Sequence, residues 1–133
     1  MSNSLQGYVL DASAVLALLN QETGADKVEQ ALLLPATCMN SVQFAEITAK
    51  LIMTGIPSAK VQEIMTELAI PIIALNEKIA FESALLMPLA KPFGLSLGDR
   101  ICLATSLTIG VPALTADKIW LQLKMLVNVE LIR

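Results

Sequence analysis

Histidine is absent from this chain of 133 residues, and cysteine occurs only twice. Without histidine the chain cannot build a Ser-His-Asp or Cys-His catalytic site or the usual zinc sites. Cys38 and Cys102 are isolated, so we expect small buried apolar roles for them rather than a disulfide framework. Any catalysis must therefore use carboxylates, hydroxyls, lysine, arginine or a metal ion.

Long hydrophobic runs are also missing. The most apolar stretches, 69–75 and 84–90, are shorter than the roughly 20 residues of a membrane span and contain Pro71 and Pro88. The first residues lack the basic start and apolar core of a secretion signal. We therefore expect a cytoplasmic protein with no membrane segment.

Basic residues are scarce: nine lysines and arginines stand against twelve acids, for a net charge of −3. This balance argues against strong passive binding to nucleic acid, which uses a basic surface, but not against a nuclease whose acids hold cations. Hydrophobic residues make up 55% of the chain, above the usual content of about 45–50%. The excess indicates extra burial, such as a homo-oligomer or partner interface.

The chain reads as one domain, residues 1–133, because it shows no repeat, linker or low-complexity tract. Short β-prone runs predict strands at 7–10, 36–39, 70–74, 112–115 and 127–131. Between them, capping residues and breakers predict helices at 12–20, 25–34, 42–54, 58–68, 77–89 (shortened at Pro88) and 97–108, and another after Asp117, with Ser41, Ser58, Asn76 and Ser96 as caps. This alternation predicts an α/β fold, with a mostly parallel five-stranded sheet flanked by helices on both faces.

Four acids stand beside apolar segments. Asp11 directly follows the first predicted strand, and Asp117 comes just after the fourth. Asp99 lies in the first turn of the helix that leads into the fourth strand, and Glu46 lies about one turn into the helix after the second. Ligands of such sheets bind at the carboxyl ends of the strands, where the strand order reverses. If the first and fourth strands are neighbours there, all four acids line one edge.

Each acid also has an ordinary structural explanation. Asp11 and Asp117 could cap the helices that follow them, and Asp99 could form a capping box with Ser96. Glu46 could pair with Lys50 one turn later. Taken together, however, the four acids suit a shared cation, and oxygen ligands without histidine select hard ions such as Mg²⁺ or Mn²⁺.

Hydroxyls accompany two of these acids. Ser13 lies two residues after Asp11, and Thr115 lies two residues before Asp117. They could make turn contacts, or they could orient a carboxylate or a metal-bound water. Both interpretations stay open on the sequence alone.

The order of these motifs is specific. Val9-Leu10-Asp11-Ala12-Ser13-Ala14 is followed by Phe44-Ala45-Glu46-Ile47, then by Leu97-Gly98-Asp99-Arg100-Ile101-Cys102-Leu103-Ala104 and Leu114-Thr115-Ala116-Asp117. This order resembles the PIN-domain ribonucleases, and among them the toxin component of VapBC toxin–antitoxin systems. The resemblance covers almost the whole chain.

The resemblance implies a single PIN-like domain with Mg²⁺- or Mn²⁺-dependent endoribonuclease activity. It implies Asp11, Glu46, Asp99 and Asp117 as catalytic and metal-binding residues, with Ser13 and Thr115 as supporting hydroxyls. It also implies an RNA substrate, a cognate VapB-like antitoxin and a homodimer. A helical antitoxin would need an apolar face, which the helices from 42 to 68 offer through Ile47, Leu51, Ile52, Val61, Ile64 and Met65. Packing in the protein's own core explains most of these residues equally well.

Among the few basic residues, Arg100 directly follows Asp99. It is equally suited to hold a phosphate of the substrate and to pair with an exposed acid.

Two alternatives compete with the nuclease. The chain could be a catalytically inactive PIN scaffold that binds a partner, although such a module has no need of a full set of acids. It could instead be another doubly wound Mg²⁺ protein. A haloacid-dehalogenase phosphatase needs a second aspartate at position 13, which is Ser13 here, and a receiver domain needs an acidic pair near the first strand that is not evident.

Overall fold

The structure, a computed structural model, describes residues 6–123 and 127–133. Its strands are β1 (Val9–Leu10), β2 (Met39–Asn40), β3 (Ile72–Ile73), β4 (Ala113–Thr115) and β5 (Val129–Leu131). Its helices are α1 (Ala12–Leu19), α2 (Ala25–Leu32), α3 (Ser41–Met53), α4 (Ser58–Leu68), α5 (Glu77–Leu85), α6 (Met87–Ala90) and α7 (Leu97–Ile109), with 3-10 turns η1 (Lys91–Phe93) and η2 (Lys118–Leu123).

All strand pairings are parallel. β4 lies between β1 and β5, while β2 pairs with β3. A parallel bridge between Val9 and Cys38 joins the two parts, supported by the Leu10 N–H donating to the Cys38 carbonyl at 2.8 Å. The resulting order β3-β2-β1-β4-β5 confirms the predicted five-stranded parallel sheet. It also makes β1 and β4 neighbours at the point where the strand order reverses.

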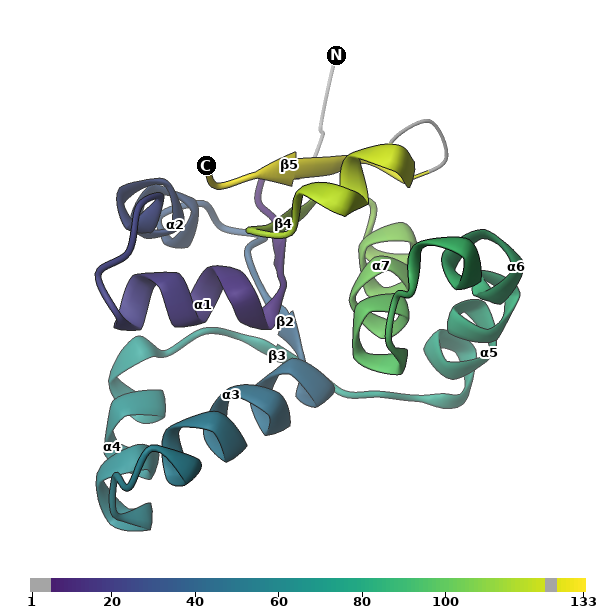
Figure 1. The fold of residues 1–133 in the computed structure, drawn as a ribbon. Coiled ribbons are helices and arrows are strands. Elements are labelled where there is room, and N and C mark those ends of the chain that lie inside the picture. Colours follow the sequence, from purple (N-terminus) through teal and green to yellow (C-terminus); the bar gives the residue numbers. More distant parts are fainter. Residues whose placement is uncertain (1–5, 124–126) are drawn as a thin grey trace.

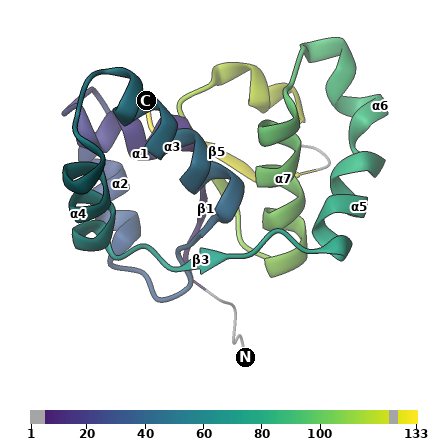
Figure 2. The ribbon, with the colours of Figure 1, turned by 90° about the horizontal axis from the view of Figure 1, so that it is seen from below.

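Helices cover both faces of the sheet (Figures 1 and 2), as the sequence predicts. α1 and α2 lie on one side, and α5, α6 and α7 lie on the other. The core divides accordingly, because successive strand side chains point to opposite faces. Leu10 and Leu114 join the apolar cluster under α1, whereas Val9 and Ala113 join the cluster that contains Trp120 and α7 residues.

Several helix starts differ from the prediction. The side chain that caps α3 is Asn40, whose Oδ1 accepts from the Val42 N–H at 2.9 Å, and Ser41 is already helical. Ser58 is likewise the first residue of α4, after Pro57. The predicted caps Asn76 and Ser96 are confirmed. The segment after Asp117 is a 3-10 turn rather than an α-helix.

At Pro88 the predicted helix is divided, as expected. α5 ends at Leu85, and the short α6 begins at Met87, so that the proline stands in a first turn where its missing N–H costs nothing. Cys38 and Cys102 are free and buried, which confirms their apolar role. Among the helices that the structure describes, none is long and apolar enough to cross a membrane.

Most of the apolar side chains on α3 and α4 that could have faced a partner belong to the core, which is the alternative explanation that the sequence offers. Ile47, Leu51, Val61 and Met65 are buried in the cluster under α1. Ile52 is half exposed. The helical spacing of these apolar residues marks the face that α3 and α4 turn toward the protein core, because the apolar stripe of a surface helix normally packs there.

Asn40 links β2, α3 and α7, and its removal should be costly. It is fully buried, caps α3 and donates from Nδ2 to Thr105 Oγ1 at 3.1 Å. We expect Asn40→Ala to lower the free energy of unfolding by about 2 kcal/mol, since a cap and a buried hydrogen bond are each worth about 1 kcal/mol. Asn76→Ala, which removes only an exposed cap, should cost about 1 kcal/mol. Equal losses in urea denaturation would contradict this role.

Candidate metal-binding nuclease site

The site forms where β1 and β4 end side by side. Leu10 pairs with Leu114, and the Asp11 N–H donates to the Leu114 carbonyl at 3.0 Å. The chain then turns into α1 after Asp11 and into η2 after Asp117. Two acids and their neighbouring hydroxyls are thus brought to one edge of the sheet.

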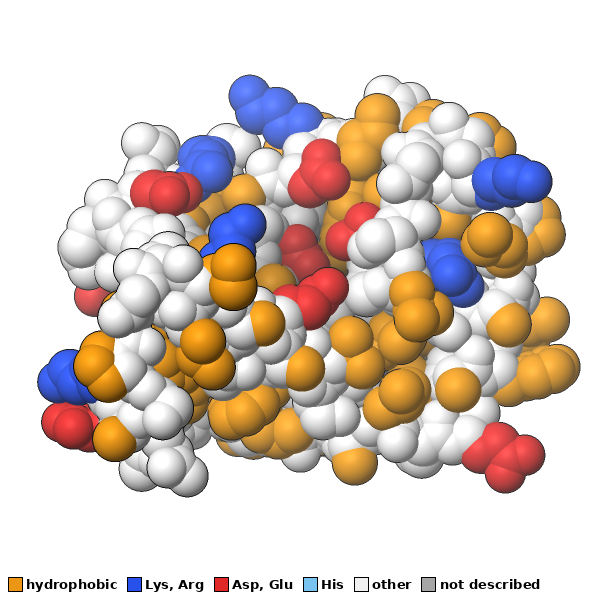
Figure 3. Space-filling model, turned by 60° about the horizontal axis from the view of Figure 1, so that its bottom comes forward, with side chains coloured by type: hydrophobic (Ala, Val, Ile, Leu, Met, Phe, Trp, Pro, Cys, Tyr) orange, Lys and Arg blue, Asp and Glu red, His pale blue; other side chains and the backbone are white. Residues whose placement is uncertain are grey.

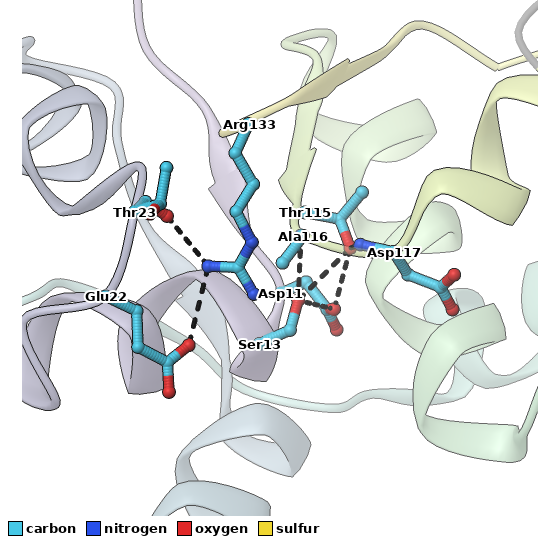
Figure 4. Close-up of polar contacts among 8 residues, drawn as sticks. All are labelled: Asp11, Ser13, Glu22, Thr23, Thr115, Ala116, Asp117 and Arg133. Atoms are coloured by element: carbon cyan, nitrogen blue, oxygen red, sulfur yellow. Dashed lines mark hydrogen bonds and ion pairs between the residues drawn. The ribbon is translucent and has the colours of Figure 1, made fainter.

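A network of hydroxyls holds the Asp11 carboxylate (Figure 4). Ser13 Oγ and Thr115 Oγ1 both donate to Asp11 Oδ2, at 2.6 and 3.0 Å. The hydroxyl oxygens accept in turn from the N–H groups of Ala116 and Asp117, at 3.0 and 3.1 Å. These N–H contacts leave each hydroxyl proton directed at the carboxylate. Asp11 stands at the N-cap of α1, but its side chain makes no capping bond, so that ordinary explanation is wrong.

Two other acids do have structural duties. Asp99 Oδ2 accepts from the Ser96 N–H at 2.9 Å in a complete capping box. Asp117 Oδ1 accepts from the Ile119 N–H at 3.1 Å at the start of η2. Each contact uses one carboxylate oxygen and fixes the orientation of the other. Capping therefore occupies one oxygen of each carboxylate and does not account for the other.

Glu46 comes to the site because α3 and α7 approach closely. A Cβ atom at Gly98 would overlap the Glu46 carboxylate, so glycine at this position lets Glu46 keep its present placement. The fully buried Gln43 bridges the two helices, donating from Nε2 to the Gly98 carbonyl at 2.8 Å. The same Nε2 lies 3.5 Å from Glu46 Oε1. Gln43 and Gly98 thus position Glu46 beside the first turn of α7, which carries Asp99.

The structure brings all four acids together around one cavity of about 520 Å³. Asp11, Glu46, Asp99 and Asp117 line it, and Figure 3 shows acidic side chains gathered in a hollow. The remaining lining residues come from α1 and α3: Ala12, Ser13, Leu16, Ala49, Lys50 and Met53.

The electrostatics of the cavity are unfavourable to its own charges. Burial raises the pKa of Asp11, the hydroxyl bonds from Ser13 and Thr115 oppose that rise, and the Asp99 charge adds to it. Burial also raises the pKa of Glu46, and repulsion from the charges of Asp11 and Asp99 raises it further. The ion pairs within the described ranges involve none of the four acids, so the expected pair between Glu46 and Lys50 does not form.

Arg100 lies apart from the cavity. Its Nη1 donates to the Ser83 carbonyl at 3.1 Å, which turns the guanidinium toward α5. Consecutive helix residues point about 100° apart, so Asp99 and Arg100 face different neighbours. The structure gives no support at this position for a contact with phosphate.

The residues fit a hydrated divalent cation. Over residues 6–123 and 127–133, no three carboxylates stand close enough to form a ready-made metal cage. Their oxygens instead surround an open cavity, and Mg²⁺ usually keeps several waters while binding one or two carboxylates directly. The all-oxygen donor set and the raised pKa values of Asp11 and Glu46 both favour an added positive charge.

Comparison with known families identifies the fold. The sequence matches the PIN domain family model over residues 8–125. The chain belongs to the PIN-domain family. This PIN domain is also similar to a Klebsiella pneumoniae toxin-antitoxin complex chain, at 21% identity, with 86% of this chain and 90% of that chain covered and a TM-score of 0.70.

Two further solved structures share the PIN fold. One is a DNA-bound VapBC from Salmonella typhimurium, at 9% identity and a TM-score of 0.75, covering 98% of this chain and 100% of that chain. The other is VapBC-1 from nontypeable Haemophilus influenzae, at 19% identity and a TM-score of 0.70, covering 94% and 97%. No curated protein matches the sequence.

Three residues of this PIN domain's site were not assigned to it from the sequence, where Lys50 is considered only as an ion-pair partner of Glu46. Gln43 and Lys50 lie one turn before and one turn after Glu46, so the helical period around a candidate acid was the available signal. Gly98 precedes Asp99 in the first turn of α7, and a glycine within a helical pattern is a signal of close backbone approach.

Titration of Asp11 gives a test of the cavity electrostatics without metal. Because burial raises its pKa above the ordinary 3.8, Asp11 binds a proton more tightly in the folded protein than in the unfolded chain. The stability that this tighter proton binding contributes is complete below the ordinary pKa of 3.8. It is lost as the pH rises through the raised pKa of the folded state. In the presence of a metal chelator, the stability of Asp11→Asn relative to wild type should therefore increase as the pH rises from about 4 through the raised pKa of the folded state.

Asp26→Asn serves as the matched control, because Asp26 is an exposed acid of α2 outside the cavity. Its stability relative to wild type should change much less over the same pH range. A pH-independent difference for Asp11→Asn in urea denaturation would show that Asp11 is not strained in the folded state.

Proposed function

We propose that this protein is a metal-dependent endoribonuclease that hydrolyses RNA phosphodiester bonds. The observation that carries the proposal is the meeting of four carboxylates around one cavity, at the strand reversal of a PIN domain. Mechanisms based on histidine or on a cysteine thiolate are unsupported, since the chain has no histidine and both cysteines are buried, which raises the pKa of each.

Mg²⁺ or Mn²⁺ would be held by Asp11, Asp99 and Asp117, directly or through water. A bound divalent ion supplies a lowered pKa for water and stabilisation of negative charge on the phosphate. Ser13 and Thr115 fix the orientation of the Asp11 carboxylate by donating to its Oδ2, which leaves Oδ1 for the ion. Asp99 and Asp117 are similarly held by one oxygen each.

Glu46 is suited to accept the proton of the attacking water at a carboxylate oxygen. Its pKa is raised by burial and by the neighbouring acids, which makes it a stronger base than an ordinary glutamate. Its side chain is more exposed than that of Asp11, so water can reach it. Gln43 and Gly98 hold it at the edge of the cavity rather than in bulk solvent.

We also propose that the nuclease is the toxin of a type II toxin–antitoxin system, acting in the cytoplasm under control of a VapB-like antitoxin. The support is the fold shared with the Klebsiella, Salmonella and Haemophilus complexes. A second cavity of about 520 Å³ between α1, α3 and α4 offers an apolar lining: Leu19, Leu51, Ile56, Ile64 and Leu68. An amphipathic helix of the antitoxin would suit such a groove.

A homodimer would cover further apolar surface. Large side chains on and around α5 stand exposed, including Phe81 at 64% and Leu85 at 58%. Scattered exposed apolar residues are normal, but several on neighbouring turns indicate a contact surface.

Replacing site acids should abolish cleavage while the fold persists. We expect Asp11→Asn and Asp99→Asn each to lower RNA cleavage in Mn²⁺ by at least about 100-fold, because both remove charge from the ion-binding cavity. Asp26→Asn should cleave like wild type. Cleavage would be measured on gels, and circular dichroism spectra would show whether each variant is folded. Full activity in a folded Asp11→Asn protein would refute the assignment, and no cleavage by wild type would favour the inactive scaffold.

Divalent ions should stabilise the folded protein. An ion that binds only the folded state adds about 2.7 kcal/mol at 100 times its Kd. We therefore expect Mg²⁺ or Mn²⁺ to raise the melting temperature of wild type, and to raise it much less in Asp11→Asn and in Asp117→Asn. Asp26→Asn should respond like wild type. Calorimetric melts that show no shift for either ion would count against a metal site.

A further inference from the structure

Lys50 is the basic side chain of the acidic cavity. The lining contains four carboxylates and, from α3, the Lys50 side chain. Lys50 lies one helical turn beyond Glu46, which places it about 5.4 Å further along the α3 axis. It therefore stands beside the site rather than within the group of acids.

The Lys50 ammonium is not committed to a carboxylate. It follows Glu46 by four residues, the spacing that favours an ion pair, yet no ion pair in the described part of the chain includes it. Lys27, Lys60 and Arg133, by contrast, are each paired with a glutamate. Lys50 is exposed and free to bind an incoming anion.

The cavity continues from the acids along α3. Ala49 and Met53 follow Glu46 on the lining, and Leu16 faces them from α1. Ala49 is exposed and Met53 is 83% exposed, so the lining next to Lys50 is an open apolar surface. A charged phosphate near Lys50 and a base near Met53 and Leu16 would match this alternation of surfaces.

We propose that Lys50 binds the phosphate next to the one that is cleaved, and that single-stranded RNA enters the site between α1 and α3. The inference rests on the proposed nuclease function and adds the path of its substrate. It assigns to Lys50 the phosphate contact that the sequence suggested for Arg100. Lysine binds phosphate as a point charge, so the contact carries no base specificity.

The test uses the salt dependence of RNA binding. In an Asp99→Asn background, in which we expect cleavage to be at least about 100-fold slower, the Kd for a short single-stranded RNA is measured at fixed Mg²⁺ over a range of KCl concentrations. Each lost phosphate contact should flatten the slope of log K against log salt by about 0.7 for a single strand. We expect this change with Lys50→Ala, and recovery of the slope with Lys50→Arg.

Lys78→Ala is the matched control. It removes the same charge from α5, outside the cavity. Its slope should stay at the value of the parent. In the active protein, Lys50→Ala should raise KM about 10-fold with little change in kcat, because the contact exists before and during cleavage.

The outcomes separate the two proposals. If the parent binds RNA and Lys50→Ala matches Lys78→Ala in slope and KM, the role of Lys50 is wrong while the nuclease stands. If the parent binds no RNA at all and wild type cleaves none, the proposed function fails and the role of Lys50 fails with it.

Discussion

The parallel pairing of β1 with β4 is the constraint on which the site depends. It sets Leu10 opposite Leu114 and so delivers Asp11 and Thr115 to the same edge, 104 residues apart in sequence. The hydroxyls of Ser13 and Thr115 then donate to one oxygen of a nearly buried carboxylate. Burying that charge is unfavourable, and these bonds recover only part of its lost hydration. The sheet thus creates a charged position that a cation would stabilise.

A second contact joins the other half of the site to this position. α3 and α7 meet where Gln43 donates to the Gly98 carbonyl and Glu46 lies over the missing Cβ. Glycine weakens a helix by about 1 kcal/mol relative to alanine, and a buried carboxamide needs its partners. Gln43 Oε1 has no partner among the described residues. Gly98 and the unpartnered Gln43 Oε1 both lower the stability of the folded state locally. This is consistent with selection for the placement of Glu46 beside Asp99, rather than for stability alone.

Sequence reasoning succeeded where local pattern decides the outcome. Alternating strand and helix patterns predicted the parallel sheet, and Asn76, Ser96 and Pro88 behave as local rules require. It failed where the tertiary environment decides. Asn40 replaces Ser41 as the α3 cap because its amide also reaches Thr105 across the core. Two choices that the sequence left open depend on the same environment. Arg100 turns toward α5, and Ile47, Leu51, Val61 and Met65 fill the core, because the direction of a side chain depends on which helix packs against it.

If RNA is the substrate, as proposed, its negative charge is repelled by the acids of this protein. A chain of net charge −3 must bind an RNA strand, and its cavity holds four carboxylates against one ammonium. Fully ionised, that cavity carries −4 + 1 = −3, and one divalent ion reduces it to −1. In the proposed function, an anionic strand would be repelled until the ion is present, and the phosphate next to the cleaved one would meet Lys50 only after that repulsion falls. The same ion that activates water would thus also admit the substrate, which makes binding and chemistry depend on one event.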